Sequence, residues 1–281
     1  MEVLGAIWSG ASDILLKILE FFYGITNSYG LAIVLLTIAI KIALYPLNQK
    51  QMLSMQQTQK LQPRIKVIQE KYANDKQKMQ EEIMRLYREY KVNPAAGCLP
   101  ILVQLPILIL LFNVLRTYEF ADASFMGILL GSSPTMGLGK ALGAVPGANG
   151  QYGIMSVLSA LFTNPAGLSN VGLYLGNVLL LVAISVLTWA QQKLSGGNNP
   201  QMAAMNTIMP FFMAFICLSM PGGVMLYWGL SSLIGVIQQY FVMKRTNEEM
   251  AVKPVLHKTK PVSQAAAAKD DDDDDDDDDE E

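Results

Sequence analysis

One lysine interrupts a long apolar run and raises the first chemical question about this chain. Lys41 stands within the apolar residues 28–47. A lysine at the middle of a membrane helix costs roughly 2.5–3.5 kcal/mol on insertion scales. Its long side chain could reach the interface, since Asn48 lies close by along the helix. Alternatively, it faces a water-filled cavity, and Thr37, one turn earlier on the same face, extends a polar stripe. Both interpretations stay open, and the second predicts a polar groove.

A second apolar run, residues 95–115, contains Gln104 and Pro106. The Gln104 amide needs a hydrogen-bond partner in apolar surroundings, either on a neighbouring helix or in a groove. Pro106 frees a backbone carbonyl that a neighbour or water must satisfy. No aspartate or glutamate lies within any of the apolar runs. This absence argues against an ion-coupled transporter, because proton relays and cation sites in membranes usually need a carboxylate.

The residue types that carry most enzyme chemistry are few and poorly placed. His257 is the only histidine and lies in a polar tail, which argues against a histidine-based triad or a two-histidine metal site. Cys98 and Cys217 lie far apart within apolar runs, so neither a disulfide framework nor a zinc site is indicated. No glycine-rich phosphate loop follows a strand-like segment. We therefore expect no enzyme activity, no cofactor, no metal and no DNA partner.

The composition indicates a membrane protein. Apolar residues make up 51% of the chain and charged residues 16%, whereas soluble domains have about 25% charged residues. Acids fill the last twelve positions, so residues 1–269 carry 21 Lys and Arg against 12 Asp and Glu. A hydrocarbon core of ~30 Å needs ~20 apolar residues in a helix. Five stretches meet this requirement, namely residues 28–47, 95–115, 171–191, 203–220 and 222–243.

The last two of these stretches are divided by Pro221-Gly222-Gly223, which predicts a tight hairpin between two spans. An alternative joins them into one broken segment, but their combined length favours two spans. Residues 1–27 form a different kind of segment. Ile14, Ile18 and Phe22 recur at helical spacing among charged residues, and this pattern predicts an amphipathic helix in the interface plane.

The distribution of Lys and Arg predicts the orientation. Loop 48–94 holds ten of them and residues 244–269 hold six, whereas residues 116–170 hold two. By the positive-inside rule, loops 48–94 and 192–202 and the C-terminus are cytoplasmic, and the N-terminus is outside. We expect short interfacial helices and loops on the outer face over residues 116–170. We also expect residues 244–281, which end in the acidic run, to be a disordered cytoplasmic tail.

The basic loop 48–94 has an internal pattern. Two apolar stripes of matching helical spacing, Leu61, Ile65, Ile68 and Tyr72 followed by Met79, Ile83, Leu86 and Tyr90, predict an antiparallel helical hairpin. Pro63 either kinks the first helix or starts a new one. The excess positive charge suits anionic lipid headgroups or ribosomal RNA. The candidate contact residues are Lys60, Arg64, Lys66, Lys71, Lys76, Lys78, Arg85 and Arg88.

These features together resemble the YidC-type membrane protein insertases, a family that includes the mitochondrial Oxa and chloroplast Alb proteins. The resemblance covers about residues 25–247 and is closest to the compact bacterial form that lacks a large periplasmic domain. The matching stretches are Thr37 to Leu47, Leu61-Gln62-Pro63, Lys91 to Pro100, Gln104 to Ile107, Met209-Pro210, Pro221 to Trp228 and Gln238-Gln239.

The resemblance implies a fold and a function. It implies an all-α polytopic membrane protein whose five transmembrane helices surround a hydrophilic groove, closed outside. It implies an insertase and chaperone in the bacterial plasma membrane that moves hydrophobic segments of nascent membrane proteins from the cytoplasm into the lipid bilayer. The process needs no nucleotide hydrolysis, and the Sec translocon and the ribosome are expected partners.

The resemblance also assigns the groove residues. Lys41 occupies the position where bacterial members usually place an arginine, and Gln104 matches a groove glutamine. Trp228 is either a groove residue or an interface anchor. Two rival functions stay open: a small-solute channel or transporter, and a holding chaperone for membrane protein assembly that does not itself insert its clients.

Overall fold

The computed structural model describes residues 2–93, 99–117, 120, 123–147, 150–195 and 200–252. Within these ranges the secondary structure is helical apart from one two-stranded sheet. Residues 1–243 form one compact unit, and residues 244–281 form a second. Parts of the predicted span 95–115 and of the predicted loop 192–202 lie outside the described residues.

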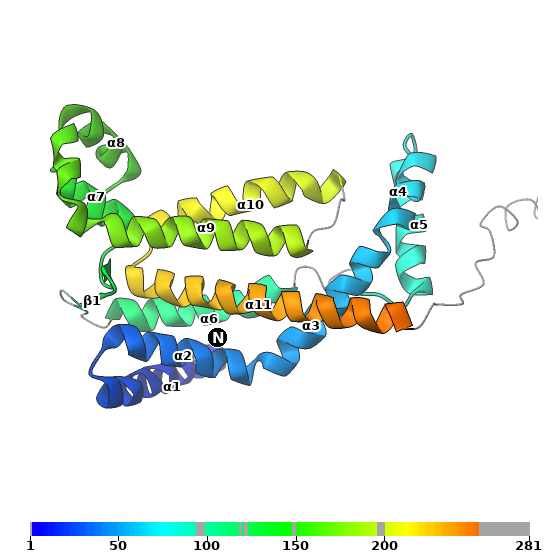
Figure 1. The fold of residues 1–281 in the computed structure, drawn as a ribbon, viewed down its shortest axis with the longest axis horizontal. Helices are drawn as coiled ribbons and strands as arrows, with labels where there is room; N and C mark the ends of the chain where they lie inside the picture. Colours follow the sequence, from blue (N-terminus) through cyan, green and yellow to red (C-terminus); the bar gives the residue numbers. More distant parts are fainter. Residues whose placement is uncertain are drawn as a thin grey trace, which may run out of the picture. The chain divides into compact units, whose positions relative to one another are not determined.

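The largest apolar cluster joins helices that are far apart in the sequence. They are α1 (Glu2–Thr26), α2 (Tyr29–Ala43), α6 (Leu99–Thr117) and α11 (Gly222–Val252), the last drawn in gold to orange in Figure 1. Leu36 of α2, Leu111 of α6 and Tyr227 of α11 are almost fully buried in it. The apolar runs of the sequence therefore form helices whose shared faces are turned toward one another.

Helix α1 joins this cluster through its C-terminal half. Leu19 is buried there, and Leu15, Ile18 and Phe22 pack around it, as the helical spacing predicted. Ile14 is exposed. Ser28 caps the start of α2, because its hydroxyl accepts a hydrogen bond from the Leu31 N–H. The orientation of α1 relative to a bilayer stays a prediction.

Helices α9 (Leu175–Ser195) and α10 (Pro200–Leu218) contact each other and pack on α11 from a second side. Ile184, Cys217 and Met225, one from each helix, are fully buried in this second cluster. A Cβ placed on Gly229 of α11 would lie 3.2 Å from the Leu180 side chain, so the missing side chain lets α11 approach α9 closely. Helix α11 is thus shared by both clusters.

The first predicted span is broken. Helix α2 ends at Ala43, and α3 (Tyr45–Lys60) begins directly after it, with the two helices bent by 63°. The predicted continuous segment 28–47 was therefore wrong at its C-terminal end. Pro46 explains the break, because proline lacks the N–H that would continue the ladder of α2 and fits the first turn of a new helix.

Helices α4 (Gln62–Lys71) and α5 (Lys76–Glu89) follow and contact each other. Pro63 lies in the first turn of α4, so it starts a new helix instead of kinking one. Asp75 caps α5 by accepting hydrogen bonds from the N–H groups of Gln77 and Lys78. The predicted stripes contribute the buried Leu61, Ile65 and Leu86 to one apolar cluster, with Ile68, Ile83 and Tyr90 around it.

The described segment between α6 and α9 contains short helices and loops, as predicted, and also a β-hairpin that was not predicted. It contains a hairpin of β1 (Ser124–Phe125) and β2 (Ile128–Leu129), then α7 (Pro134–Leu142), α8 (Ile154–Thr163) and the 3-10 turns η2 (Pro165–Ser169) and η3 (Val171–Leu173). Met126 and Gly127 both have positive φ, 50° and 81°, which suits a two-residue hairpin loop. The all-α fold class holds for the described residues, and this two-residue-per-strand hairpin is a local addition to it.

Helix lengths also differ from the predicted spans. Helix α9 begins at Leu175, because residues 171–173 form a 3-10 turn, and α11 continues to Val252, into the predicted disordered tail. Among the described residues, one helix is by itself long and apolar enough to cross a membrane, at Leu175–Leu194. The bent pair α2 and α3 would provide a second if it forms one span.

Candidate substrate groove

Lys41 lines a cavity of about 280 Å³ between the α2–α3 junction and α11. Its polar atoms come from Lys41, Tyr45 and Gln238, and the remaining wall is apolar. None of the described residues that line the cavity is acidic. Because a cation in apolar surroundings needs an anion or water, this cavity can accept a negatively charged group.

The other predicted groove residues lie outside this lining. Thr37 is fully buried, and its hydroxyl donates to the Ile33 carbonyl at 2.7 Å. Gln104 Nε2 donates to the Tyr227 hydroxyl at 3.0 Å, joining α6 to α11. Trp228 packs against both apolar clusters. The structure thus places Lys41 at the cavity and the other three side chains among the packed helices.

Buried polar atoms without a hydrogen-bond partner lie on α3, α9 and α11 and at the first residue of α4. Within the described part of the chain they belong to Gln51, Gln56, Gln62, Thr188, Gln192, Ser231 and Gln238. Native proteins leave few such atoms unpaired, and ordered water usually satisfies those that remain. Gln238 belongs both to this set and to the Lys41 cavity. We call these seven residues the polar zone.

Two contacts show that the helices of the polar zone are neighbours. Gln59 Nε2 of α3 donates to the Leu194 carbonyl of α9 at 3.1 Å. A Cβ on Gly235 of α11 would lie 3.0 Å from Nε2 of Gln191 on α9. Thr188, Ser231 and Gln238 lie within the predicted spans 171–191 and 222–243, whereas Gln51 and Gln56 lie in the predicted loop 48–94.

The opposite end of the bundle is tied together by hydrogen bonds. Asn177 of α9, only 1% exposed, accepts from the Leu129 N–H at 2.8 Å and donates to the Leu129 carbonyl at 3.0 Å and to the Ser132 carbonyl. The Gly222 N–H also donates to the Ser132 carbonyl, at 3.0 Å. The polar groups at this end are therefore paired with one another, unlike those of the polar zone.

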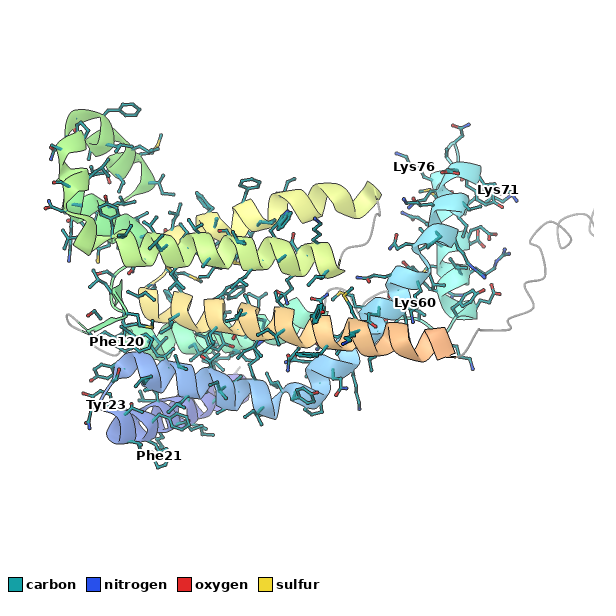
Figure 2. All side chains as sticks on the ribbon, viewed as in Figure 1. Phe21, Tyr23, Lys60, Lys71, Lys76 and Phe120 are labelled. Carbon is teal, nitrogen blue, oxygen red and sulfur yellow. The ribbon has the colours of Figure 1, made fainter. Side chains whose placement is uncertain are left out.

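The predicted basic contact surface lies on the α4–α5 hairpin and the end of α3. Figure 2 labels Lys71 and Lys76 on the hairpin and Lys60 at the end of α3. All eight predicted residues are exposed except Lys66, which is half-buried. Arg64 donates to the Tyr90 hydroxyl and lies over its ring, 4.8 Å from the centroid. Arg85 pairs with Glu82 at 2.6 Å. Lys71 and Lys78 lie over the Tyr72 ring, 5.4 and 5.9 Å from its centroid. The exposed cations beyond these contacts are Lys60, Lys76 and Arg88.

The contact between α4 and α5 beneath this surface is apolar, and Tyr87 packs against its buried cluster. Burial raises the pKa of the Tyr87 phenol above its ordinary value. Tyr87 therefore stays neutral at physiological pH and does not reduce the positive charge of the hairpin.

Comparisons with known proteins show which family the chain belongs to. The model of the family described as "60Kd inner membrane protein" matches residues 21–249. A protein of Fusobacterium nucleatum named "Membrane protein insertase YidC" is 41% identical over 239 residues, which cover 83% of this chain and 97% of that protein. A Chlamydia caviae protein of the same name is 36% identical over 82% of this chain but only 27% of its own length.

One solved structure extends the comparison to the fold. It is described as "Active YidC insertase crystal structure with the first transmembrane domain resolved". The TM-score is 0.59 at 30% sequence identity, and the match covers 83% of this chain and 46% of that one. The chain thus spans nearly all of one relative and less than half of the Chlamydia protein and of the solved chain.

Proposed function

This chain belongs to the 60Kd inner membrane protein family, and from this premise we propose that it is a membrane protein insertase. It would move hydrophobic segments of nascent proteins from the cytoplasm into the bilayer without hydrolysing a nucleotide. The observation that carries the proposal is the asymmetry of the bundle. A cation and a zone of unpaired buried polar atoms lie toward one end, and the other end is closed by mutual hydrogen bonds.

The proposal includes a membrane arrangement. Helices α2, α6, α9, α10 and α11 would be the five spans, with α1 at the outer interface and the α4–α5 hairpin in the cytoplasm. The excess of Lys and Arg in residues 48–94 over residues 116–170 supports this orientation. In it, the Lys41 cavity and the polar zone face the cytoplasmic half, and Asn177 lies near the outer surface.

Physical chemistry links this arrangement to insertion. The polar outer tail of a client must cross hydrocarbon. Each unsatisfied polar group there costs roughly 2–7 kcal/mol, depending on the reference state used for the transfer. A hydrated zone that reaches partway through the bilayer shortens this crossing. Lys41 would favour acidic tails by charge attraction, and burial of the client's apolar helix in lipid would drive the reaction.

We assign different roles to the four groove residues. Lys41 would contact the client directly. Thr37 keeps the adjacent turn of α2 closed, and the Gln104–Tyr227 hydrogen bond holds α6 against α11. Trp228 would support the wall through its packing. Lys41 keeps the charge of an arginine but lacks its planar five-donor group, so it would act as a point charge.

The exposed cations of the α4–α5 hairpin would meet anionic surfaces of partners such as the ribosome, and the Sec translocon would be a second partner. Lys71, Lys76 and Arg88 are exposed on this hairpin. The support is electrostatic, because clustered Lys and Arg attract polyanions in a salt-dependent manner.

Reconstitution of the full chain in vesicles with a short single-span client tests the proposal. Clients with an acidic outer tail should insert with the native chain and with Lys41→Arg, and poorly with Lys41→Glu because of like-charge repulsion. Clients with a neutral tail are the matched control, and their insertion should fall less in Lys41→Glu. Normal insertion of acidic-tailed clients by Lys41→Glu would remove the proposed role of the cation.

The same vesicles separate the rival functions. A channel would show solute flux without any client. A holding chaperone would bind the client and keep it soluble without protecting its tail inside the vesicle. Either result without insertion would overturn the insertase assignment.

A further inference from the structure

Helix α8 has two apolar faces, and the fold uses only one of them. Val157 and Ala160 are buried against α7, where Leu142 completes a small cluster. Met155, Leu158 and Phe162 recur at i, i+3 and i+7 and therefore share another face of the helix. They are 79%, 45% and 85% exposed.

The polar side chains of α8 are already satisfied within the helix. The Ser156 hydroxyl donates to the Gly153 carbonyl at 2.8 Å, and the Ser159 hydroxyl to the Ser156 carbonyl at 2.9 Å. The Thr163 hydroxyl donates to the Ser159 carbonyl at 3.1 Å. Such pairing is required where water is scarce, because an unpaired donor in hydrocarbon is costly. It leaves the face of Met155, Leu158 and Phe162 apolar in character.

Charge is missing from the whole surrounding segment. Residues 141–192 contain no Asp, Glu, Lys, Arg or His. A surface in water normally contains charged residues throughout, and an exposed helix face without them favours an apolar neighbour.

The exposed face belongs to a unit that is fixed to a membrane-facing helix. Helix α7 contacts both α8 and α9, and Figure 1 shows α7 and α8 in green at the N-terminal end of α9. Helix α9 is the described helix that is by itself able to span a bilayer. Its exposed residues Leu179, Val182 and Val186 form an apolar stripe. Helix α7 thus links the exposed apolar face of α8 to the end of a helix that also carries an exposed apolar stripe.

We propose that the face of α8 formed by Met155, Leu158 and Phe162 inserts into the bilayer leaflet at the Leu175 end of α9. In the orientation given above, this is the outer leaflet. The helix would lie at the boundary between headgroups and acyl chains, with its apolar side buried in lipid. The occupant is lipid because three features match hydrocarbon: the link through α7 to the apolar helix α9, the internal pairing of the hydroxyls and the absence of charge.

Spin labels on single cysteines test this placement in the full chain. The background carries Cys98→Ala and Cys217→Ala, and the protein is reconstituted in vesicles of phosphatidylethanolamine and phosphatidylglycerol. Phe162→Cys and Leu158→Cys report the proposed lipid face. Lys140→Cys is the matched control, because Lys140 is an exposed charged residue on α7. Collision rates are measured with oxygen, which dissolves in lipid, and with a nickel chelate, which stays in water.

Labels at 158 and 162 should collide several-fold more often with oxygen than with nickel, and the label at 140 should show the opposite preference. A nickel preference at 162 equal to that at 140 would place the face in water. Low collision with both reagents at 158 and 162 would place it against protein, either a second copy or a partner. Both of these results overturn the proposal. The readout is independent of insertase activity, so its failure is distinguishable from a failure of the proposed function.

Discussion

Asn177 should hold the closed end of the bundle together, and its replacement by alanine removes the contact cleanly. The side chain is almost fully buried and bonds to the backbone of residues 129 and 132, far from it in the sequence. Alanine fits the helix and introduces no new polar group. The loss of stability therefore reports the three hydrogen bonds and the groups left behind.

The loss of stability in Asn177→Ala depends on which of its former partner groups still make another hydrogen bond. The Ser132 carbonyl still accepts from the Gly222 N–H at 3.0 Å, and the Leu129 carbonyl still accepts from the Ser132 N–H at 3.3 Å. The Leu129 N–H has no such substitute. Ser124 and Leu129 face each other next to the bonded pair Ala123 and Leu130. Since bonded and non-bonded pairs alternate in an antiparallel ladder, this N–H points away from β1.

Leaving the Leu129 N–H buried without an acceptor costs about 1–3 kcal/mol. Losing the hydrogen bonds to the Leu129 and Ser132 carbonyls costs about 1 kcal/mol each. We therefore expect Asn177→Ala to lower the free energy of unfolding by about 3–5 kcal/mol. For a chain of this size, 1 kcal/mol corresponds to about 2–4 °C in Tm, so the unfolding midpoint should fall by about 10 °C.

Thermal unfolding in one detergent at one scan rate measures this change. Asn164→Ala is the matched control, because the exposed Asn164 donates one hydrogen bond to the Leu142 carbonyl at 3.1 Å. It should lower the midpoint by only a few degrees. Hydrogen exchange over residues 124–135 should become faster in Asn177→Ala. A midpoint equal to that of the control, with unchanged exchange, would refute the role of Asn177 as the clamp of this end.

Three further predictions test other parts of the chain. Single cysteines at Ser124 and Gln77 should label from outside and only after permeabilisation, respectively, and the reverse pattern would overturn the orientation. Ile65→Ala should destabilise the α4–α5 hairpin by about 2–5 kcal/mol and speed its proteolysis, whereas the exposed Val67→Ala should not; equal proteolysis would contradict the apolar contact between α4 and α5. Deletion of residues 270–281 should tighten ribosome binding at low salt, because the acidic run competes with polyanions for basic residues. Identical binding across a salt series would leave the run without a role in docking.

Local chemistry made part of the fold predictable. Proline lacks a backbone N–H, so Pro221 predicted a break between two helices, and Pro63 predicted either a kink or the start of a new helix. The structure has helix boundaries at both. The same logic applies to Pro46, but the apolar run across Leu44 and Leu47 suggested one continuous span. Hydropathy measures burial in lipid and does not detect a bend, so the break between α2 and α3 was missed.

Long-range pairing was the part that the sequence could not provide. Gln104 was visible as a polar residue that needs a partner, but Tyr227 lies 123 positions away and was not identified as that partner. Asn177 stood out only as one of several polar residues in a predicted span. Its partners belong to a β-hairpin that was itself expected to be helix or loop. Residue type indicates that a partner is needed, and only the fold determines which one it is.

The unpaired amide atoms of the α3 glutamines favour hydration, whereas the hydrogen-bonded groups around Asn177 oppose it at the other end of the bundle. Gln51 and Gln56 leave buried amide atoms without partners, and packing would favour apolar residues there unless water enters. A zone that admits water through the full thickness of a membrane would conduct ions. The hydrogen bonds of Asn177 and Gly222 remove the polar groups that could hydrate the other end. In the proposed function, hydration on one side and mutual pairing on the other would let a client's tail enter the bundle while the bilayer stays sealed.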